Sequence, residues 1–301
     1  MPEAVHTPVL LDEVLALLAP RPGGRYVDAT IDGGGHAGAL LAATAPDGRV
    51  LGIDRDPEIL GALRVRAARA IDAGRLLLAH ASFASLTEVV SSYQFTPVDG
   101  VLFDLGLSSF HLDASARGFS FQRDEPLDMR FDPTDADLER AADILAARSA
   151  EELTALLRTY GEERFASRIA RSVVARRRST PLRTSGELLA VIEQSLPPQV
   201  RWRAARDAAR VFQALRIAAN DELAAVTAAL PQALAALPGG GRLVVISFHS
   251  LEDRVVKNFL RDQQRAGRLR IMTKKPLQPS QAELAANPRA ASAKLRAAER
   301  V

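Results

Sequence analysis

The chain has 301 residues, 47% of them apolar and 25% charged, which is the composition of an ordinary soluble globular protein. It contains no cysteine, which excludes disulfides, thiolate zinc sites, iron–sulfur clusters and every mechanism that needs a cysteine nucleophile. No run of about 18 apolar residues occurs, and the N-terminus lacks the basic-then-apolar pattern of a signal peptide, so we expect a cytoplasmic protein without a membrane span.

The first hundred residues alternate short β-type runs with helical stretches. Strands are expected at 26–30, 50–54, 76–80 and 98–104, and helices at 37–43 and 57–72. A succession of strand, helix and strand predicts a parallel sheet with right-handed crossovers.

This alternation stops between about residues 113 and 206, where the sequence shows only helix signals, broken by prolines. It resumes with a helix at 210–229, a strand at 242–247, a helix at 251–264 and short strands at 269–272 and 293–296. The simplest account is a Rossmann-like α/β domain made of residues 1–112 and 207–301, interrupted by an all-helical insertion at 113–206.

The net charge of +3 is unevenly distributed. Residues 99–157 contain 13 acidic and 5 basic side chains, residues 158–216 contain 5 and 13, and residues 254–301 contain 3 and 12. Basic blocks indicate a polyanionic partner, although solvated helix faces in an arginine-rich chain would give the same pattern. The five histidines show no ligand spacing, so we expect no structural metal.

A glycine-rich turn follows the first predicted strand. Gly33, Gly34, Gly35 and His36 open a G-x-G-x-x-G pattern, in which glycines let the backbone approach a ligand closely. Asp54 ends the next strand, 19 residues after Gly35, where a carboxylate accepts hydrogen bonds from the ribose of a nucleoside cofactor. The pair predicts a nucleoside cofactor, and a plain strand-to-helix turn is the alternative.

NAD-type dinucleotides and S-adenosylmethionine both suit this geometry, and the details favour the second. Asp28 ends the strand and four residues precede Gly33, whereas a dinucleotide loop begins directly at the strand end. A carboxylate at that point suits the cationic methionine moiety; a helix cap is the other interpretation of Asp28. Phe83 after the third strand and Asp104 at the end of the fourth would complete an adenine pocket and a reaction edge, unless Phe83 is simply core.

Ten segments, in order, resemble one family, the bacterial 16S ribosomal RNA cytosine-N4 methyltransferases (MraW-like). The segments are 6–11, 34–36, 53–56, 104–109, 118–121, 126–130, 160–165, 212–217, 246–254 and 287–290. The resemblance implies a class I S-adenosylmethionine-dependent methyltransferase fold, a helical RNA substrate domain, and a decoding-centre cytidine of 16S rRNA in the small ribosomal subunit as the target. The cofactor contacts that it implies are Gly34, Gly35, His36, Asp54, Phe83 and Asp104.

The chain departs from the family pattern after Ser108 and Ser109. The family usually continues with Pro-Gln, and this chain has Phe110 and His111. The resemblance therefore places the glutamine's cofactor contact at His111, which can still donate one hydrogen bond. A surface histidine is the alternative.

The residues themselves restrict the reaction. Methylation of cytosine at C5 needs a cysteine nucleophile, whereas transfer to an exocyclic nitrogen or a hydroxyl needs only an acceptor held near a carboxylate. Asp104 and Phe110 suit a flipped base, but the Asp-Pro-Pro-aromatic run of amino methyltransferases is absent, so nitrogen and oxygen acceptors both stay open. Asp104 and Ser108 are candidate catalytic residues, with backbone carbonyls up to Ser108 as second hydrogen-bond acceptors. The rival functions are an NAD-dependent oxidoreductase and a non-catalytic RNA-binding assembly factor.

His249 follows the fifth strand and is a candidate contact for the target nucleotide. The alternative is that it caps the following helix or orders the loop. Ser250 is also predicted to N-cap this helix, with Asp253 as its partner three residues on.

Three arginines of the insertion recur at near-helical spacing beside an apolar stripe that we expect to be core. They form either a solvated face or a track for RNA phosphates. The arginines are Arg164, Arg168 and Arg171, and the stripe is Phe165, Ile169 and Val173. The oligomeric state is left open, with a homo-oligomer as one outcome.

Overall fold

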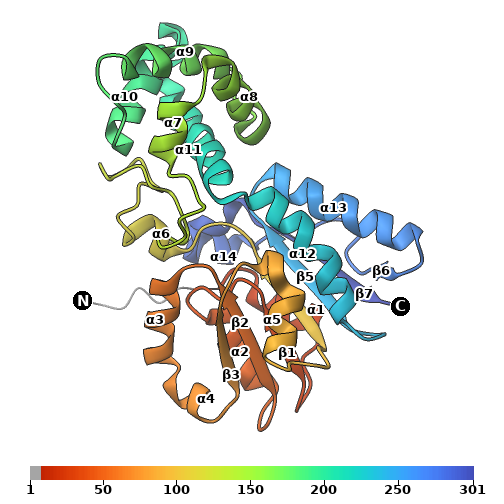
Figure 1. Cartoon of the computed structure of the whole chain (residues 1–301). Coiled ribbons are helices and arrows are strands. Elements are labelled where there is room, and N and C mark those ends of the chain that lie inside the picture. The colour runs from red at the N-terminus through yellow and green to blue at the C-terminus, as the bar shows by residue number, and fades with distance from the viewer. Residues whose placement is uncertain (1–7) are drawn as a thin grey trace. The chain divides into compact units, whose positions relative to one another are not determined.

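The computed structural model describes residues 8–301, which divide into two compact units. The sheet unit runs to Gly106 and resumes over Leu223–Val301, and the helical unit is Leu107–Glu222 (Figure 1). The predicted insertion at 113–206 lies inside the helical unit, which extends further at both ends.

A seven-stranded sheet with the order β3-β2-β1-β4-β5-β7-β6 forms the centre of the sheet unit. The strands are β1 (Arg25–Asp28), β2 (Arg49–Asp54), β3 (Leu76–His80), β4 (Gly100–Asp104), β5 (Arg242–Ser247), β6 (Leu269–Ile271) and β7 (Lys294–Arg300). The first five are parallel, and β7 runs antiparallel to both β5 and β6. The direction of strand succession reverses between β1 and β4, which is where open α/β sheets bind ligands.

Helices cover both faces of this sheet, so its strands are almost continuously apolar. The helices are α1 (Leu11–Leu18), α2 (Gly35–Ala43), α3 (Pro57–Arg66), α4 (Ala68–Asp72), α5 (Leu86–Ser92), α12 (Glu222–Ala236), α13 (Ser250–Arg265) and α14 (Gln281–Ala286). Val27 and Val101 point to a core shared with α5, α12 and α13, whereas Tyr26 and Leu102 point to a second core shared with α1, α2 and α3. The predicted α/β, Rossmann-like sheet is thus confirmed.

The helical unit is a bundle with its own core. Its helices are α6 (Ser109–Asp113), α7 (Ala141–Ala147), α8 (Ala150–Gly161), α9 (Ala166–Arg177), α10 (Ser185–Ser195) and α11 (Ala204–Asn220), and a 3₁₀ turn, η2, covers Pro198–Arg203. Leu157, Ile169 and Phe212, from α8, α9 and α11, are buried together. Because α11 carries its apolar face into this core, the unit extends well past residue 206. Residues 114–140, where the sequence shows only helix signals, form loops.

Two predicted helices are wrong in extent. The helix expected at 57–72 is interrupted at Ala67 and becomes α3 and α4. The helix expected at 210–229 ends at Asn220, because Asp221 adopts a left-handed conformation with φ of 50°. The Asn220 amide donates to the carbonyls of Arg216 and Met129, and its oxygen accepts from the Phe131 N–H, so distant loops fix this break.

No helix within residues 8–301 is long and apolar enough to cross a membrane.

Candidate active site

Three carboxylates mark the carboxyl edge of the sheet. Asp28, Asp54 and Asp104 are the last residues of β1, β2 and β4. Since β1 pairs in parallel with both β2 and β4, the three strand ends meet at the same edge. The pairing of the strands therefore places Asp28, Asp54 and Asp104 at one edge of the sheet, as predicted.

Asp28 is fully buried, and its Oδ1 accepts a hydrogen bond from the Thr30 N–H at 3.3 Å. Burial, together with the charges of Asp54 and Asp32, raises the pKa of Asp28 to about 7. Asp28 does not cap a helix, because the residue before α2 is Gly34. A cationic group beside Asp28 would offset the repulsion between its carboxylate and those of Asp54 and Asp32.

Asp104 is held in a similarly unfavourable environment. Its backbone N–H donates to Thr30 Oγ1 at 2.6 Å, and its Oδ1 is buried without a hydrogen-bond partner among residues 8–301. Burial, and after it the charges of Asp28, Asp32 and Glu252, raise the pKa of Asp104 well above its usual value. A buried carboxylate oxygen without a partner is the kind of atom that a ligand completes.

His36 lies beside Asp104 in the first turn of α2. Its Nε2–H donates to the Val9 carbonyl at 2.9 Å, which leaves Nδ1 facing Asp104 Oδ2 at 3.6 Å. Both contacts are buried, so the imidazole ties the segment before α1 to the carboxyl edge of the sheet.

Asp54 accepts backbone hydrogen bonds on both of its oxygens. The N–H of Asp32 donates to Oδ2 at 3.0 Å, and the N–H of Asp56 donates to Oδ1 at 2.9 Å. These two bonds fix the orientation of the Asp54 carboxylate at the end of β2.

The glycine-rich turn leaves no room for side chains. Gly34 has a φ of +76°, and a Cβ there would lie 2.8 Å from Leu63. A Cβ on Gly35 would lie 3.1 Å from Pro8. The Gly33 carbonyl accepts a bond from Arg66 at 3.0 Å. The turn therefore brings bare backbone to the start of α2, whose N-terminus carries partial positive charge.

Phe83 lies in a 3₁₀ turn (Phe83–Ser85) after β3 and is half-buried. Its ring meets the ring of Phe103 edge-on, at 5.7 Å between centroids and an angle of 88°. Phe83 thus packs on the core and keeps an accessible part, so the structure is compatible with both interpretations of this residue.

His249 is the N-cap of α13. Its Nδ1 accepts from the Glu252 N–H at 3.3 Å, its Nε2 lies 3.1 Å from Glu252 Oε1, and Glu252 accepts the N–H of His249 at 3.2 Å. The predicted capping box of Ser250 and Asp253 is wrong, because the true box begins one residue earlier. Asp253 instead pairs with Arg296 at 2.7 Å. The contact of His249 with a target nucleotide stays a prediction.

Ser108 and His111, in the helical unit, form a capping box at the start of α6. Ser108 Oγ accepts from the His111 N–H at 3.2 Å, and His111 Nδ1 accepts from the Ser108 N–H at 3.3 Å. Capping boxes normally use Glu or Gln at this third position, and here His111 fills it. His111 is buried among Phe110, Phe119 and Phe131, and its cofactor contact stays a prediction.

The three predicted RNA-binding arginines are exposed. Arg168 and Arg171 lie on α9, and Arg164 precedes that helix with its guanidinium 4.5 Å from the centroid of the Phe165 ring. Ile169 and Val173 are core residues, as expected of the apolar stripe. Whether the arginines bind phosphates stays a prediction.

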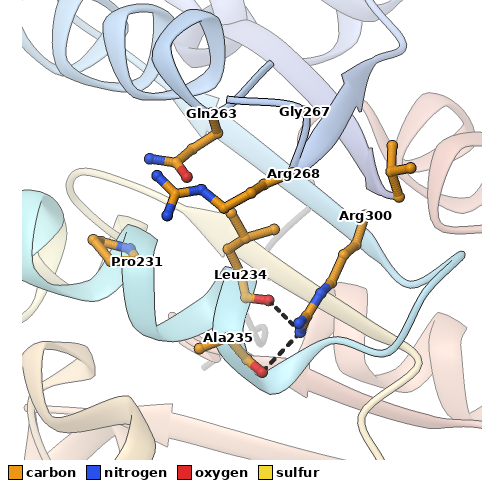
Figure 2. Close-up of a pocket in the computed structure, with 8 residues that line it drawn as sticks. Pro231, Leu234, Ala235, Gln263, Gly267, Arg268 and Arg300 are labelled. Atoms are coloured by element: carbon orange, nitrogen blue, oxygen red, sulfur yellow. Dashed lines mark hydrogen bonds between the residues drawn. The ribbon is translucent and has the colours of Figure 1, made fainter. Parts of the chain in front are cut away.

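A cavity of about 390 Å³ lies elsewhere in the sheet unit (Figure 2). Arg300, which lines it, donates to the carbonyls of Leu234 at 3.0 Å and Ala235 at 2.9 Å, near the end of α12. The pairing of Glu299 with Arg242 places Arg300 at the start of β5, at the edge opposite to the three carboxylates. We therefore do not assign the cavity to the candidate active site.

Two residues of the site are missing from the sequence-based prediction. Thr30 Oγ1 accepts the hydrogen bond from the Asp104 N–H. Asp32, which has a φ of 42°, donates its N–H to Asp54, and its charge helps to raise the pKa of Asp28. The signal for Asp32 is its place directly before Gly33. Nothing in the local sequence indicates the role of Thr30.

Comparison with known proteins decides the family. The model of the MraW methylase family matches residues 3–301. The chain belongs to the MraW methylase family. It is 50% identical to the ribosomal RNA small subunit methyltransferase H of Thermomicrobium roseum, over 98% of this chain and 94% of that protein. It is 46% identical to the protein of that name from Heliobacterium modesticaldum, over 98% of each.

Among solved structures, an rRNA methylase from Streptococcus thermophilus is similar, with a TM-score of 0.43 and 14% identity over 97% of this chain and 93% of that chain. Membership of the MraW family bears out the resemblance, and with it the class I methyltransferase fold. The oxidoreductase and the non-catalytic assembly factor are not supported, because the family is one of methylases.

Proposed function

We propose that this protein is an S-adenosylmethionine-dependent methyltransferase that modifies the exocyclic N4 amine of a decoding-centre cytidine in 16S rRNA. The observation that carries the proposal is the carboxylate edge formed by Asp28, Asp54 and Asp104 in a chain of the MraW family. Relatives at 42–50% identity are named ribosomal RNA small subunit methyltransferase H, which supports the rRNA substrate.

The residues at this edge fit the cofactor. S-adenosylmethionine supplies an electrophilic methyl group on a positively charged sulfur, next to a cationic amine. Asp28, whose pKa is raised to about 7 by burial and by neighbouring carboxylates, is suited to hold the cationic methionine part. Asp54 would accept the ribose hydroxyls, and the half-buried Phe83 would contact the adenine.

Backbone atoms complete the proposed cradle. Gly33, Gly34 and Gly35 would present only backbone atoms to the ligand at the start of α2, and a Cβ on Gly34 or Gly35 would press against Leu63 or Pro8. His36 would hold this turn against the carboxyl edge through its bond to Val9.

Asp104 is proposed as the catalytic group. The N4 lone pair of cytosine is delocalised into the ring, so the nitrogen is a poor nucleophile until one of its hydrogens is bonded by a strong acceptor. Burial raises the pKa of Asp104, which makes its carboxylate a stronger acceptor than an exposed aspartate. Positive charge develops on N4 during transfer, so the carboxylate stabilises the transition state more than the ground state.

The helical unit is proposed as the RNA substrate domain. Arg164, Arg168 and Arg171 are exposed and would neutralise phosphates of the small-subunit rRNA. Within this unit, Ser108 would order the start of α6 by capping it. The protein would act in the cytoplasm, where ribosomal subunits assemble.

The test uses the full-length protein with methyl-labelled cofactor and unmethylated small ribosomal subunits, followed by digestion and mass spectrometry of the nucleosides. We expect label in N4-methylcytidine, and its formation about 10²-fold slower when Asp104→Asn is used under single-turnover conditions matched to the wild type. Label in a C5-methylated or ribose-methylated nucleoside, or no label at all, would contradict the proposal.

A further inference from the structure

Trp202 is the only tryptophan of the chain and is 82% exposed. The other large apolar side chains that are exposed among residues 8–301 all belong to the sheet unit. They are Val65, Tyr93, Leu277 and Val301. Within residues 107–222 the indole therefore stands alone, without an apolar patch around it, and the fold of the helical unit does not use it.

The backbone under Trp202 is held in a defined conformation. Pro197 and Pro198 open the 3₁₀ turn η2, and the Val200 N–H donates to the Pro197 carbonyl at 3.0 Å. Arg201 Nε donates to the Leu196 carbonyl at 3.3 Å. The turn continues directly into α11, so the indole is presented on a rigid element and not on a loose loop.

One guanidinium group lies beside the indole. The Arg203 guanidinium lies 5.9 Å from the Trp202 ring centroid, and its side chain is 3.7 Å from Asp207, which is fully buried. Asp207 thereby keeps Arg203 beside the ring. Arg201 and Arg206, close to Trp202 in the sequence, are exposed, and the only acidic residue within 198–210 is this buried aspartate.

We propose that Trp202, with Arg201, Arg203 and Arg206, is a stacking platform for one unpaired base of the RNA substrate. The inference rests on the proposed function, because it requires that RNA is the partner. Bases stack on aromatic rings whatever their sequence, and nearby guanidiniums bind the flanking phosphates. A protein partner would call for further apolar residues around the indole, and residues 107–222 expose none.

The single tryptophan makes the test direct, since fluorescence excited at the red edge, where the three tyrosines do not absorb, reports on Trp202 alone. The full-length protein is titrated with an unlabelled single-stranded oligoribonucleotide of about ten nucleotides and mixed sequence. Stacking should quench the fluorescence along the same isotherm that anisotropy of a labelled oligoribonucleotide gives.

Variants separate stacking from charge. Trp202→Ala should weaken RNA binding about 5- to 150-fold without changing the salt dependence, whereas Trp202→Phe should retain most of the affinity. Arg206→Ala should instead lower the slope of log K against log salt by about 0.7. Val65→Ala, which removes an 80% exposed apolar side chain of the sheet unit, is the matched control and should bind like the wild type.

The proposal is overturned if Trp202→Ala binds RNA like the wild type, or if saturating RNA leaves the fluorescence unchanged. If the wild type still methylates small subunits in that case, the proposed function stands and Trp202 has another partner, such as a protein. If the wild type neither binds nor methylates RNA, both proposals fail together.

Discussion

Both units of the molecule bury carboxylates, but they surround them differently. In the sheet unit, Asp28 and Asp104 are buried among other carboxylates, and the pKa of each is raised by burial and by those charges. In the helical unit, the buried carboxylates face arginines. Glu163 Oε2 lies 3.9 Å from Arg210 Nη1, and Asp207 Oδ1 lies 3.7 Å from Arg203 Nη2. Arg216 donates a hydrogen bond to each carboxylate oxygen of Glu222. Burial raises the pKa of Glu163 as well, and the charge of Asp207 adds to this, while the hydrogen bond from the Phe165 N–H and the charge of Arg210 act against it.

The difference fits the proposal that the carboxylates of the sheet unit bind a cationic ligand. A carboxyl group whose pKa is raised on folding stabilises the fold at low pH and loses this contribution as the pH rises through its folded pKa. For Asp28 that loss occurs between about pH 4 and pH 7, so the protein without its ligand is destabilised by this group at neutral pH. In the helical unit, Glu163 and Asp207 each face an arginine of the same unit, although Glu163 Oε2 and both oxygens of Asp207 accept no hydrogen bond among residues 8–301.

The largest effect is expected where the helical unit loses such a partner. Arg216 donates to Glu222 through Nε at 2.7 Å and through its terminal nitrogen at 2.8 Å, and both side chains are almost fully buried. Arg216→Ala leaves the carboxylate unpaired and should lower the free energy of unfolding by about 3–5 kcal/mol in urea titrations. Arg140→Ala, which breaks the exposed pair with Asp143, is the control and should cost at most about 1 kcal/mol. Equal losses would remove the distinction between buried and exposed pairs.

The next largest effect concerns the sheet unit. Asp104→Asn keeps the shape of the side chain but removes its charge, so the single-turnover rate should fall about 10²-fold or more with RNA binding little changed. If saturating S-adenosylmethionine restores the rate, Asp104 serves the cofactor only and the catalytic assignment fails.

Asp54→Ala tests the ribose contact. Charged hydrogen bonds contribute roughly 1.5–3 kcal/mol, so calorimetry with S-adenosylhomocysteine should show affinity reduced at least about tenfold. Asp72→Ala, at an exposed position at the end of α4, serves as the control and should leave the affinity unaltered. Unchanged binding by a folded Asp54→Ala variant would remove this residue from the site.

The smallest effect is expected for the exposed arginines of the helical unit. Each replacement of Arg164, Arg168 or Arg171 by Ala should lower the magnitude of the slope of log K for RNA against log salt by about 0.7 on single strands. Affinity for the cofactor should stay the same. If the triple variant has the wild-type slope, these arginines do not bind phosphates and form only a solvated face.

The sequence predicts the parallel strands and the three carboxylates well, because both follow from short-range patterns. Asp28, Asp54 and Asp104 each end a buried apolar run, and parallel strand ends meet at one edge. The break at Asp221 escapes prediction, because Asn220 is fixed by bonds to the loop at Met129 and Phe131, about ninety positions away.

The capping of α13 shows a second limit. His249 and Ser250 are adjacent and both can cap a helix, and the choice depends on Glu252, which reaches back to two backbone N–H groups. The raised pKa values are likewise unpredictable from sequence, since they depend on how deeply the strand ends are buried and on which charges meet there.

The most direct test of the carboxylate edge is the pH dependence of S-adenosylmethionine binding to the wild type and to Asp28→Asn. Protonation of Asp28 below its pKa of about 7 removes the charge that faces the cation, so wild-type affinity should fall about tenfold between about pH 8 and pH 6. The Asp28→Asn variant should bind weakly and without this dependence. Wild-type affinity that does not change over this range, or an equal dependence in both proteins, would contradict the account.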